Sequence, residues 1–189
     1  MPAVLTDPSG AIRSLSGHVG PLDAAMRFAA VYLVFAAALA VLSLWFRRDG
    51  LRPLVAAGFG AVVAVVLTAA IGSVWDRPRP FVAGHFVPLI THAADASFPS
   101  DHLAALGAVT ICLWWTSRRL GAVVAAIAVV VAFARVYVGV HYVSDVVGGF
   151  ALGLACGAAM WWVTGRLMPL IAEVDGLLIR LRLRPRPGR

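Results

Sequence analysis

The segment ARVYVGVHYVSDVVGG, which begins at Ala134, holds the most informative polar side chains of the chain. His141 and Asp145 are four residues apart, so on a helix they share one face and can touch. A carboxylate beside an imidazole fixes its tautomer and raises its basicity, as the orienting group of a catalytic histidine does. Arg135 can converge on His141 if the chain turns at Gly139. The alternative for this segment alone is a helix-capping pair and an arginine that extends to the membrane interface.

A second polar cluster, SFPSDH, runs from Ser97 to His102 and precedes a long apolar stretch. Pro99 ends the preceding loop, and Ser100 is a good N-cap residue. The backbone N–H groups that follow, near Asp101 and His102, would be unpaired at a helix N-terminus and would form an anion site suited to phosphate. The alternative is an ordinary capped helix start.

The third cluster is RPRPF, from Arg77 to Phe81, which places two arginines in a rigid turn. The planar guanidinium of arginine favours bidentate contacts with phosphate, although Arg77 and Arg79 could also meet lipid headgroups. Taken together, the three clusters provide phosphate-binding groups, a nucleophilic histidine with its carboxylate, and a second histidine. This set suits cleavage of a phosphate monoester or diphosphate through a phosphohistidine without a metal ion.

The rest of the sequence indicates that a membrane holds these clusters. Of the 189 residues, 61% are hydrophobic and only 13% are charged, and the mean hydropathy is +0.88. Apolar runs near the length that a bilayer requires predict an all-α polytopic bundle with about five transmembrane helices, or six. The five expected spans are 26–46, 53–75, 100–116, 120–137 and 146–167. Cys112 and Cys156 lie inside such runs and are expected to be small core residues, with no disulfide and no metal.

The distribution of arginine predicts the orientation of the bundle. There is no lysine, and the side with more arginine is expected to be cytoplasmic. Five tryptophans fall at the ends of the expected spans on the arginine-rich side, where an aromatic belt is expected. They are Trp45, Trp114, Trp115, Trp161 and Trp162. We therefore predict a lead-in segment (1–25) on the outer side, without a cleavable signal peptide, a membrane domain (26–168) and a basic cytoplasmic tail (169–189). The arginines assigned to the cytoplasmic side are Arg47, Arg48, Arg52, Arg118, Arg119, Arg166, Arg180, Arg182, Arg184, Arg186 and Arg189.

The three clusters resemble, in order and spacing, the motifs of the type 2 phosphatidic acid phosphatase superfamily, membrane branch. The Asp at position 101, where most of that superfamily has Gly, makes the chain similar to the bacterial undecaprenyl-diphosphatase branch of the bacitracin-resistance type. Two further positions depart from the motifs, since Gly72 stands in the place of a lysine and Ala134 in the place of a serine.

The resemblance implies hydrolysis of undecaprenyl diphosphate to undecaprenyl phosphate and phosphate, without a cofactor, at the outer face of a bacterial inner membrane. This activity would recycle the lipid carrier of cell-envelope synthesis. His141 would be the nucleophile, Asp145 its orienting group and His102 the general acid. No role is assigned to His85, to His92 or to the carboxylate of Asp101. The phosphoryl oxygens would be bound by Arg79, Ser100, Arg135 and the backbone of Asp101, with Arg77 as a substitute for the missing lysine.

Other hypotheses stay open at this stage. The same chemistry could act on phosphatidylglycerophosphate, phosphatidate or another polyprenyl phosphate. The chain could instead be a small transporter, or a divalent-metal protein with ligands from His85, His92, Asp95 and His102, although metal ligands usually show tighter spacing. A structural membrane protein is the remaining hypothesis. The expected partners are a lipid phosphate substrate and membrane lipid, with no nucleic acid.

Overall fold

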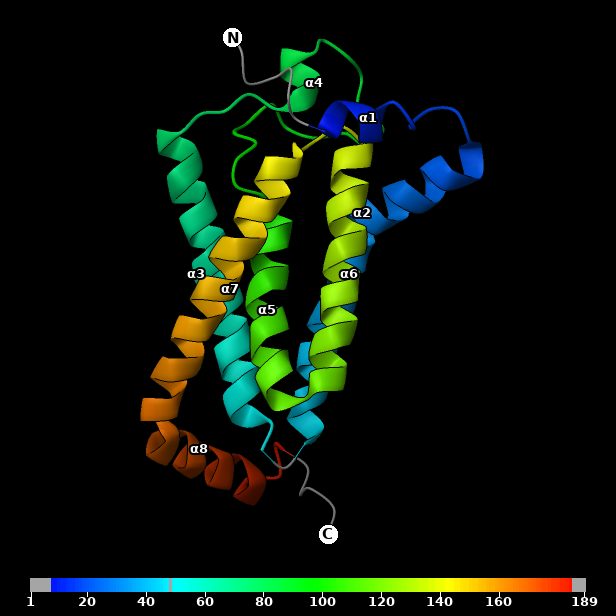
Figure 1. Cartoon of the computed structure of the whole chain (residues 1–189). Helices are drawn as coiled ribbons and strands as arrows, with labels where there is room; N and C mark the ends of the chain where they lie inside the picture. The colour runs from blue at the N-terminus through cyan, green and yellow to red at the C-terminus, as the bar shows by residue number, and fades with distance from the viewer. Residues whose placement is uncertain (1–7, 48, 185–189) are drawn as a thin grey trace.

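The computed structural model describes residues 8–47 and 49–184, and the described residues form helices and connecting loops without a strand (Figure 1). The predicted all-α bundle is thereby confirmed. Arg48, Arg186 and Arg189, which contributed to the predicted orientation, lie outside the described residues. The long helices are α2 (Gly20–Ser43), α3 (Leu51–Val74), α5 (Asp101–Thr116), α6 (Arg118–Tyr137) and α7 (Val143–Arg166), and the short ones are α1 (Ser9–Arg13), η1 (Leu44–Phe46), α4 (Pro80–Ala83) and α8 (Met168–Arg180).

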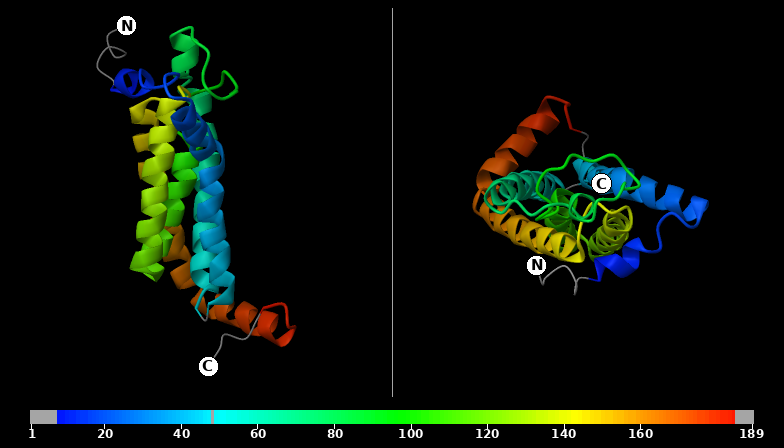
Figure 2. Two further views of the ribbon diagram at one scale, coloured as in Figure 1. Left: turned by 90° about the vertical axis from the view of Figure 1, so that its right-hand side faces the viewer. Right: turned by 90° about the horizontal axis from the view of Figure 1, so that it is seen from above.

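Four segments of the described chain are long and apolar enough to cross a membrane: Gly20–Phe46, Leu51–Val74, Arg118–Tyr137 and Val143–Arg166. The protein is therefore a multi-pass membrane protein. The remaining predicted span corresponds to α5, which has 16 residues and occupies the centre of the bundle, in contact with α3, α6 and α7 (Figures 1 and 2). Figure 1 shows that α5 begins below the adjacent ends of α6 and α7, so its N-terminus is recessed.

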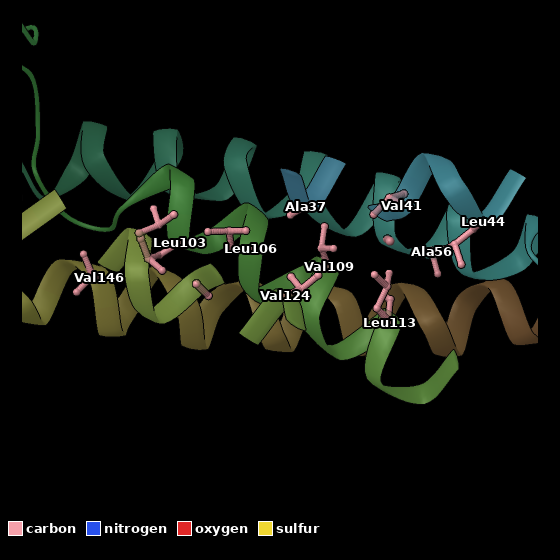
Figure 3. Packing of buried hydrophobic residues seen from close by; sticks show 14 of the residues in the cluster. Ala37, Val41, Leu44, Ala56, Leu103, Leu106, Val109, Leu113, Val124 and Val146 are labelled. Carbon is pink, nitrogen blue, oxygen red and sulfur yellow. The ribbon is translucent and has the colours of Figure 1, made fainter. Parts of the chain in front are cut away.

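Apolar side chains cover both the inside and the outside of the bundle, as expected for a protein in hydrocarbon. Large side chains such as Phe35 and Leu39 on α2 are more than half exposed. Inside, α5 contributes the middle of the core (Figure 3). The core residues labelled there are Ala37, Val41, Leu44, Ala56, Leu103, Leu106, Val109, Leu113, Val124 and Val146.

Glycines on α7 allow this helix to lie directly on α5. A Cβ atom at Gly149 would collide with the carbonyl oxygen of Ser100, and one at Gly153 would collide with that of Ala104. Small residues let helix backbones approach closely in a membrane. At the polar end of the bundle, this close approach lets the backbone N–H of Ser100 donate a hydrogen bond of 3.1 Å to the carbonyl oxygen of Asp145.

The two ends of the bundle are capped differently. At one end lie α1, α4 and the loops that carry the polar clusters, whereas α8 lies across the other end (Figures 1 and 2). The predicted tail is therefore helical over Met168–Arg180. Arg184 follows this helix and is buried, where it pairs with Asp175 and donates a hydrogen bond of 2.9 Å to the carbonyl oxygen of Trp45.

Candidate active site

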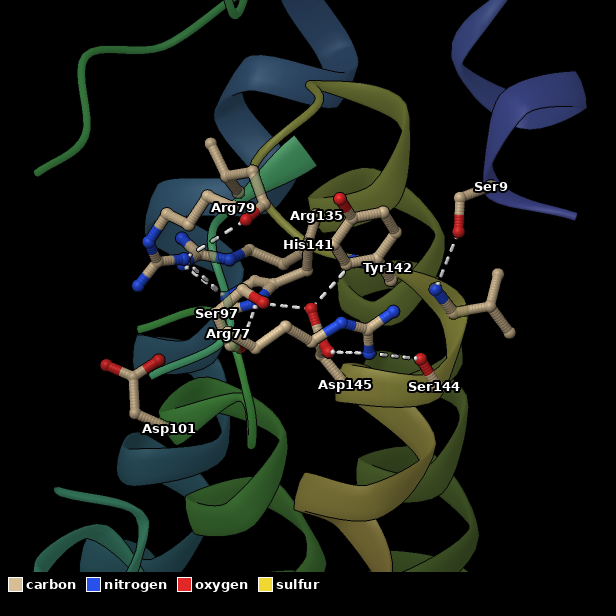
Figure 4. Close-up of polar contacts among 12 residues, drawn as sticks. Ser9, Arg77, Arg79, Ser97, Asp101, Arg135, His141, Tyr142, Ser144 and Asp145 are labelled. Carbon is tan, nitrogen blue, oxygen red and sulfur yellow. Dashed lines mark hydrogen bonds and ion pairs between the residues drawn. The ribbon is translucent and has the colours of Figure 1, made fainter. Parts of the chain in front are cut away.

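The three clusters predicted from the sequence meet at the end of the bundle where α3 and α6 end and where α5 and α7 begin (Figure 4). Arg79 immediately precedes α4, Ser100 is the N-cap residue of α5, and Arg135 lies in the last turn of α6. His141 lies in the short loop between α6 and α7, and Asp145 lies in the first turn of α7.

His141 is the centre of this arrangement, and its side chain is buried. Its Nε2 lies 3.1 Å from Nη2 of Arg135 and 3.3 Å from Nη1 of Arg79. Guanidinium groups only donate hydrogen bonds, so Nε2 must be the acceptor and Nδ1 must carry the proton. Nδ1 accordingly donates to the carbonyl oxygen of Ser97, at 2.9 Å. The lone pair of Nε2 therefore faces two positive charges, where an anion would bind.

A turn at Gly139 makes this convergence possible. Gly139 has a φ of +87°, in the left-handed region that glycine adopts without strain. A side chain at this position would also collide with the ring of Phe86. The turn brings His141 back onto Arg135 and presents the carbonyl oxygen of Val140 to Nη1 of Arg79, at 3.1 Å.

Asp145 lies behind the imidazole and is held by several donors. Its Oδ2 accepts a hydrogen bond of 2.8 Å from the backbone N–H of Tyr142 and lies 3.5 Å from Nδ1 of His141. Asp145 thus both caps the start of α7 and faces the histidine. The two alternatives for this segment, a capping residue and a carboxylate beside the imidazole, therefore apply together. The carbonyl of Ser97 is the nearer acceptor, and sequence reasoning missed it because a backbone atom leaves no signature in residue types.

Arg77 also contacts Asp145. Its Nη1 lies 2.8 Å from Oδ1 of Asp145 and 2.7 Å from Oγ of Ser144, and its guanidinium lies 4.0 Å from the ring centroid of Tyr142. These contacts are on the side of Asp145 away from Nε2 of His141 (Figure 4). Arg77, predicted as a phosphate ligand, is therefore engaged with the carboxylate that faces the histidine.

Buried hydrogen-bond donors lie near the histidine, and some of them have no acceptor among the described residues. Arg79 and Arg135 are 4% and 2% exposed, and Asp95 forms an ion pair of 2.8 Å with Nε of Arg79. Within the described residues, Nε of Arg135 and the hydroxyls of Ser97 and Ser100 are buried without a hydrogen-bond partner. Buried donors of this kind are costly unless they are paired. A tetrahedral oxyanion, with several acceptor oxygens and negative charge, would satisfy such donors.

The recessed start of α5 contributes two further predicted residues. Oδ1 of Asp101 lies 2.9 Å from Nδ1 of His102 and accepts a hydrogen bond of 2.8 Å from the backbone N–H of His102. The carboxylate of Asp101 is half exposed and the side chain of His102 is one-quarter exposed. Within the described part of the chain, His102 hydrogen-bonds to Asp101 and not to the groups around Nε2 of His141.

His92, which had no assigned role, belongs to the buried cluster. Its Nε2 lies 3.1 Å from Nη2 of Arg135, and its ring centroid is 6.3 Å from that of His141. His92 and Asp95 are three residues apart in the sequence, and in the structure Nδ1 of His92 lies 3.7 Å from Oδ1 of Asp95, which pairs with Arg79. His85 is exposed beyond α4. No group of three or more His, Cys, Asp or Glu side chains among the described residues could hold a metal ion, so the alternative set of ligands does not form one site.

A cavity of about 660 Å³ opens beside Arg79, between α3 and the loop before α5. Asp95, Phe98 and Asp101 are among its lining residues, as is Gly72, which occupies the position of the missing lysine. A Cβ atom at Gly72 would lie 3.2 Å from the Cβ of Ala96. The absence of a side chain at Gly72 therefore lets this loop approach α3.

The protonation state of His141 follows from its surroundings. Burial lowers the pKa of His141 to about 4; Arg135 and Arg79 act in the same direction, while Asp145 opposes them. The imidazole is therefore neutral at pH 7, the form in which Nε2 has a free lone pair.

The chain is also similar in sequence to known proteins. The sequence profile described as the PAP2 superfamily matches residues 53–169. The chain is 34% identical over 163 residues to undecaprenyl-diphosphatase BcrC of Bacillus subtilis (strain 168), which covers 85% of this chain and 84% of that protein.

Two crystal structures are also similar to this chain. One is the first transmembrane PAP2 type phosphatidylglycerolphosphate phosphatase from Bacillus subtilis, with a TM-score of 0.66, 25% identity and 88% of each chain covered. The other, Aquifex aeolicus LpxE, shares the fold with a TM-score of 0.67 at 22% identity, covering 80% of this chain and 91% of the other.

Proposed function

The chain belongs to the PAP2 superfamily and is a membrane lipid phosphatase, and from this premise we propose that its substrate is undecaprenyl diphosphate. The products would be undecaprenyl phosphate and inorganic phosphate, as the name of the Bacillus subtilis relative suggests. In this role the protein would return the lipid carrier of cell-envelope synthesis to its monophosphate form. The resemblance to diphosphatases of the bacitracin-resistance type suggests that the activity would also contribute to bacitracin resistance.

In the first step, Nε2 of His141 attacks the terminal phosphorus. The bond from this phosphorus to the bridging oxygen breaks, and the bridging oxygen leaves with undecaprenyl phosphate. His102 protonates this oxygen as general acid. The carbonyl of Ser97 and the carboxylate of Asp145 stabilise the positive charge that develops on the imidazole ring.

In the second step, water attacks the phosphohistidine and gives a proton back to His102, the P–N bond breaks, and orthophosphate and neutral His141 are released. Arg79, Arg135, Ser100 and the backbone N–H of Asp101 bind the phosphoryl oxygens through both steps. Because phosphoryl transfer depends mainly on positioning and charge stabilisation, two fixed guanidinium groups suit this reaction.

One observation carries the proposal: two buried guanidiniums converge on Nε2 of His141, whose other nitrogen is held by a backbone carbonyl. A structural ion-pair network would place a carboxylate at this point. A neutral imidazole whose Nε2 faces two guanidinium groups, of which Asp95 pairs with Nε of Arg79 on another edge, instead suits a site for an anionic, electrophilic group. The substrate assignment is supported by the sequence similarity to the diphosphatase.

We propose that the site faces the outer side of the cell membrane. Arg47, Arg52, Arg118, Arg119 and Arg166 lie at or next to the helix ends at the α8 end of the bundle. Trp115 and Trp161, near the C-terminal ends of α5 and α7, pack together with ring centroids 5.6 Å apart. Positive charge favours the cytoplasmic side, and tryptophan favours the interface. The polar cluster lies at the opposite end, and the domain 26–168 would span the membrane between them.

The decisive experiment measures phosphate release from undecaprenyl diphosphate by purified protein in detergent, with EDTA present. Wild type is expected to turn over and to be inhibited by vanadate, and His141→Ala is expected to lose all measurable activity. Full activity of His141→Ala would rule out the phosphohistidine mechanism.

A second candidate substrate is phosphatidylglycerophosphate, since one structural relative acts on that class of lipid. The same assay with phosphatidylglycerophosphate and phosphatidate separates the two proposals. A higher kcat/KM for either glycerolipid than for undecaprenyl diphosphate would replace the proposed substrate and leave the chemistry unchanged.

A further inference from the structure

We propose that His92 is a further phosphoryl ligand of this site, which takes up a proton when an anion binds and releases it when phosphate leaves. This inference rests on the proposed function, because it assumes that a phosphoryl group occupies the space between Arg79 and Arg135. It adds a group that binds the phosphoryl oxygens, in a different role from the general acid His102.

His92 and His141 contact the same nitrogen atom, Nη2 of Arg135. Nη2 of Arg135 lies 3.1 Å from Nε2 of His92 and 3.1 Å from Nε2 of His141. The two rings meet edge to face, with centroids 6.3 Å apart. A phosphoryl group that binds Arg135 and lies within reach of His141 is therefore also within reach of Nε2 of His92.

Hydrogen bonding indicates that His92 is neutral while the site holds no anion. Nδ1 of His92 lies 3.1 Å from the carbonyl oxygen of Ala93, which can only accept, so Nδ1 carries a proton. Nε2 faces a guanidinium, which can only donate, so Nε2 is an acceptor. In this state His92 presents a lone pair to the site and would repel a phosphoryl oxygen.

The charges around His92 explain how binding would reverse this state. The side chain is 20% exposed, and Oδ1 of Asp95 lies 3.7 Å from its Nδ1. Burial lowers the pKa of His92, the Ala93 carbonyl and Asp95 raise it, and Arg79 on the α4 side and Arg135 on α6 lower it. Asp95 also pairs with Arg79, which weakens its support for an imidazolium.

A bound phosphoryl group changes this balance, because it brings negative charge to both guanidiniums and to Nε2 of His92. An opposite charge within about 4–6 Å favours the charged form of a titratable group. His92 then takes one proton from solvent, and its Nε2–H donates a hydrogen bond to a phosphoryl oxygen. When orthophosphate leaves, the same proton returns to solvent, so the net charge of the protein is the same before and after the cycle.

The test is anion binding to the full chain in detergent by isothermal titration calorimetry. Sulfate is the first probe because it stays a dianion between pH 5.5 and 8, so any proton taken up goes to the protein. Buffers that differ in ionisation enthalpy report the number of protons taken up. Wild type is expected to bind sulfate with uptake of up to one proton; binding without proton uptake would overturn the proposal.

Variants identify the group that takes up the proton. His92→Gln is expected to bind sulfate about tenfold more weakly at pH 6 than wild type, with little difference at pH 8 and without proton uptake. His85→Gln is the matched control, because it removes an exposed histidine from the same loop and is expected to behave like wild type. A His92→Gln protein that keeps wild-type affinity and proton uptake would overturn the inference, and His92→Asn provides a second substitution.

Failure of the proposed function gives a different result. Phosphate release from the lipid substrates is measured on the same preparations. If wild type releases no phosphate from any of them, the proposed function is wrong, whereas the sulfate titrations still decide the role of His92. If wild type is active but His92→Gln binds sulfate as wild type does, only the inference about His92 fails.

Discussion

The carbonyl oxygen of Ser97 accepts a hydrogen bond of 2.9 Å from Nδ1 of His141, and this contact is shorter than the 3.5 Å between the same nitrogen and Asp145. The tautomer of His141 is therefore set by a backbone atom that no side-chain substitution removes. The carboxylate of Asp145 adds a negative charge beside an imidazole ring that the Ser97 carbonyl already orients.

Where a carboxylate alone fixes the tautomer of a catalytic histidine, its replacement by an amide lowers kcat about 10⁴-fold. We expect a smaller effect from Asp145→Asn, because Ser97 also fixes the tautomer of His141. We expect kcat for phosphate release to fall by roughly 10²-fold, because charge stabilisation is lost while Ser97 keeps the proton on Nδ1. Single-turnover phosphate release measures this. A loss as large as that of His141→Ala would mean that Ser97 does not orient the ring.

Arg77 and Arg79 are expected to respond differently to the same substitution. Nη1 of Arg77 contacts Asp145, whereas Nη1 of Arg79 contacts Nε2 of His141. Arg77→Lys should lower kcat and leave inhibition by inorganic phosphate within about twofold of wild type. Arg79→Lys should weaken that inhibition about tenfold, because a bidentate donor is lost. Equal weakening of phosphate inhibition in both variants would make Arg77 a phosphate ligand.

The buried neutral state of His141 predicts a dependence of stability on pH. Its pKa is lowered to about 4 in the folded protein, and the ordinary value is about 6.5. Between these values the unfolded chain binds a proton that the folded chain does not, so stability is lost as pH falls from 6.5 towards 4. The slope for one such group is at most about 1.4 kcal/mol per pH unit.

Thermal unfolding of the detergent-solubilised protein between pH 7 and pH 4.5 measures this effect. His141→Asn removes the titrating group and is expected to unfold with a shallower dependence on pH than wild type. Other groups, such as His92, contribute equally to both proteins, so the difference isolates His141. Identical pH profiles would show that His141 does not remain neutral in the folded state.

The sequence predicted the helices better than the contacts within the site. Apolar runs predicted about five spanning helices, or six, and four segments of the described chain are long and apolar enough to cross a membrane. The helix α2 begins at Gly20 rather than near residue 26, because Pro21 and Asp23 suit its first turn. The convergence of Arg135 and His141 was also predictable from a glycine turn between them. The role of the Ser97 carbonyl and the partner of Arg77 depend on how a loop folds over α3, and side-chain periodicity carries no information on that.

The approach of α7 to α5 is expected to depend on Gly149. In Gly149→Ala the new Cβ would collide with the carbonyl oxygen of Ser100, so the start of α5 must move. We expect a loss of about 1–3 kcal/mol in the free energy of unfolding and a fall in kcat, because Ser100 lies in the wall of the site. Gly58→Ala on α3 is the control, since a Cβ there would meet open space. If the two variants are equally stable and active, close packing at Gly149 does not position the site.

The proposed orientation can be tested by chemical labelling in intact cells. Cys112 and Cys156 are buried, so the native chain should react little with a membrane-impermeant maleimide. Val87 is 92% exposed at the end of the bundle that holds the site, and Glu173 is exposed on α8 at the other end. Val87→Cys is therefore expected to be labelled in intact cells, and Glu173→Cys only after the membrane is permeabilised. The opposite pattern would place His141 on the cytoplasmic face and exclude hydrolysis of a lipid diphosphate in the outer leaflet.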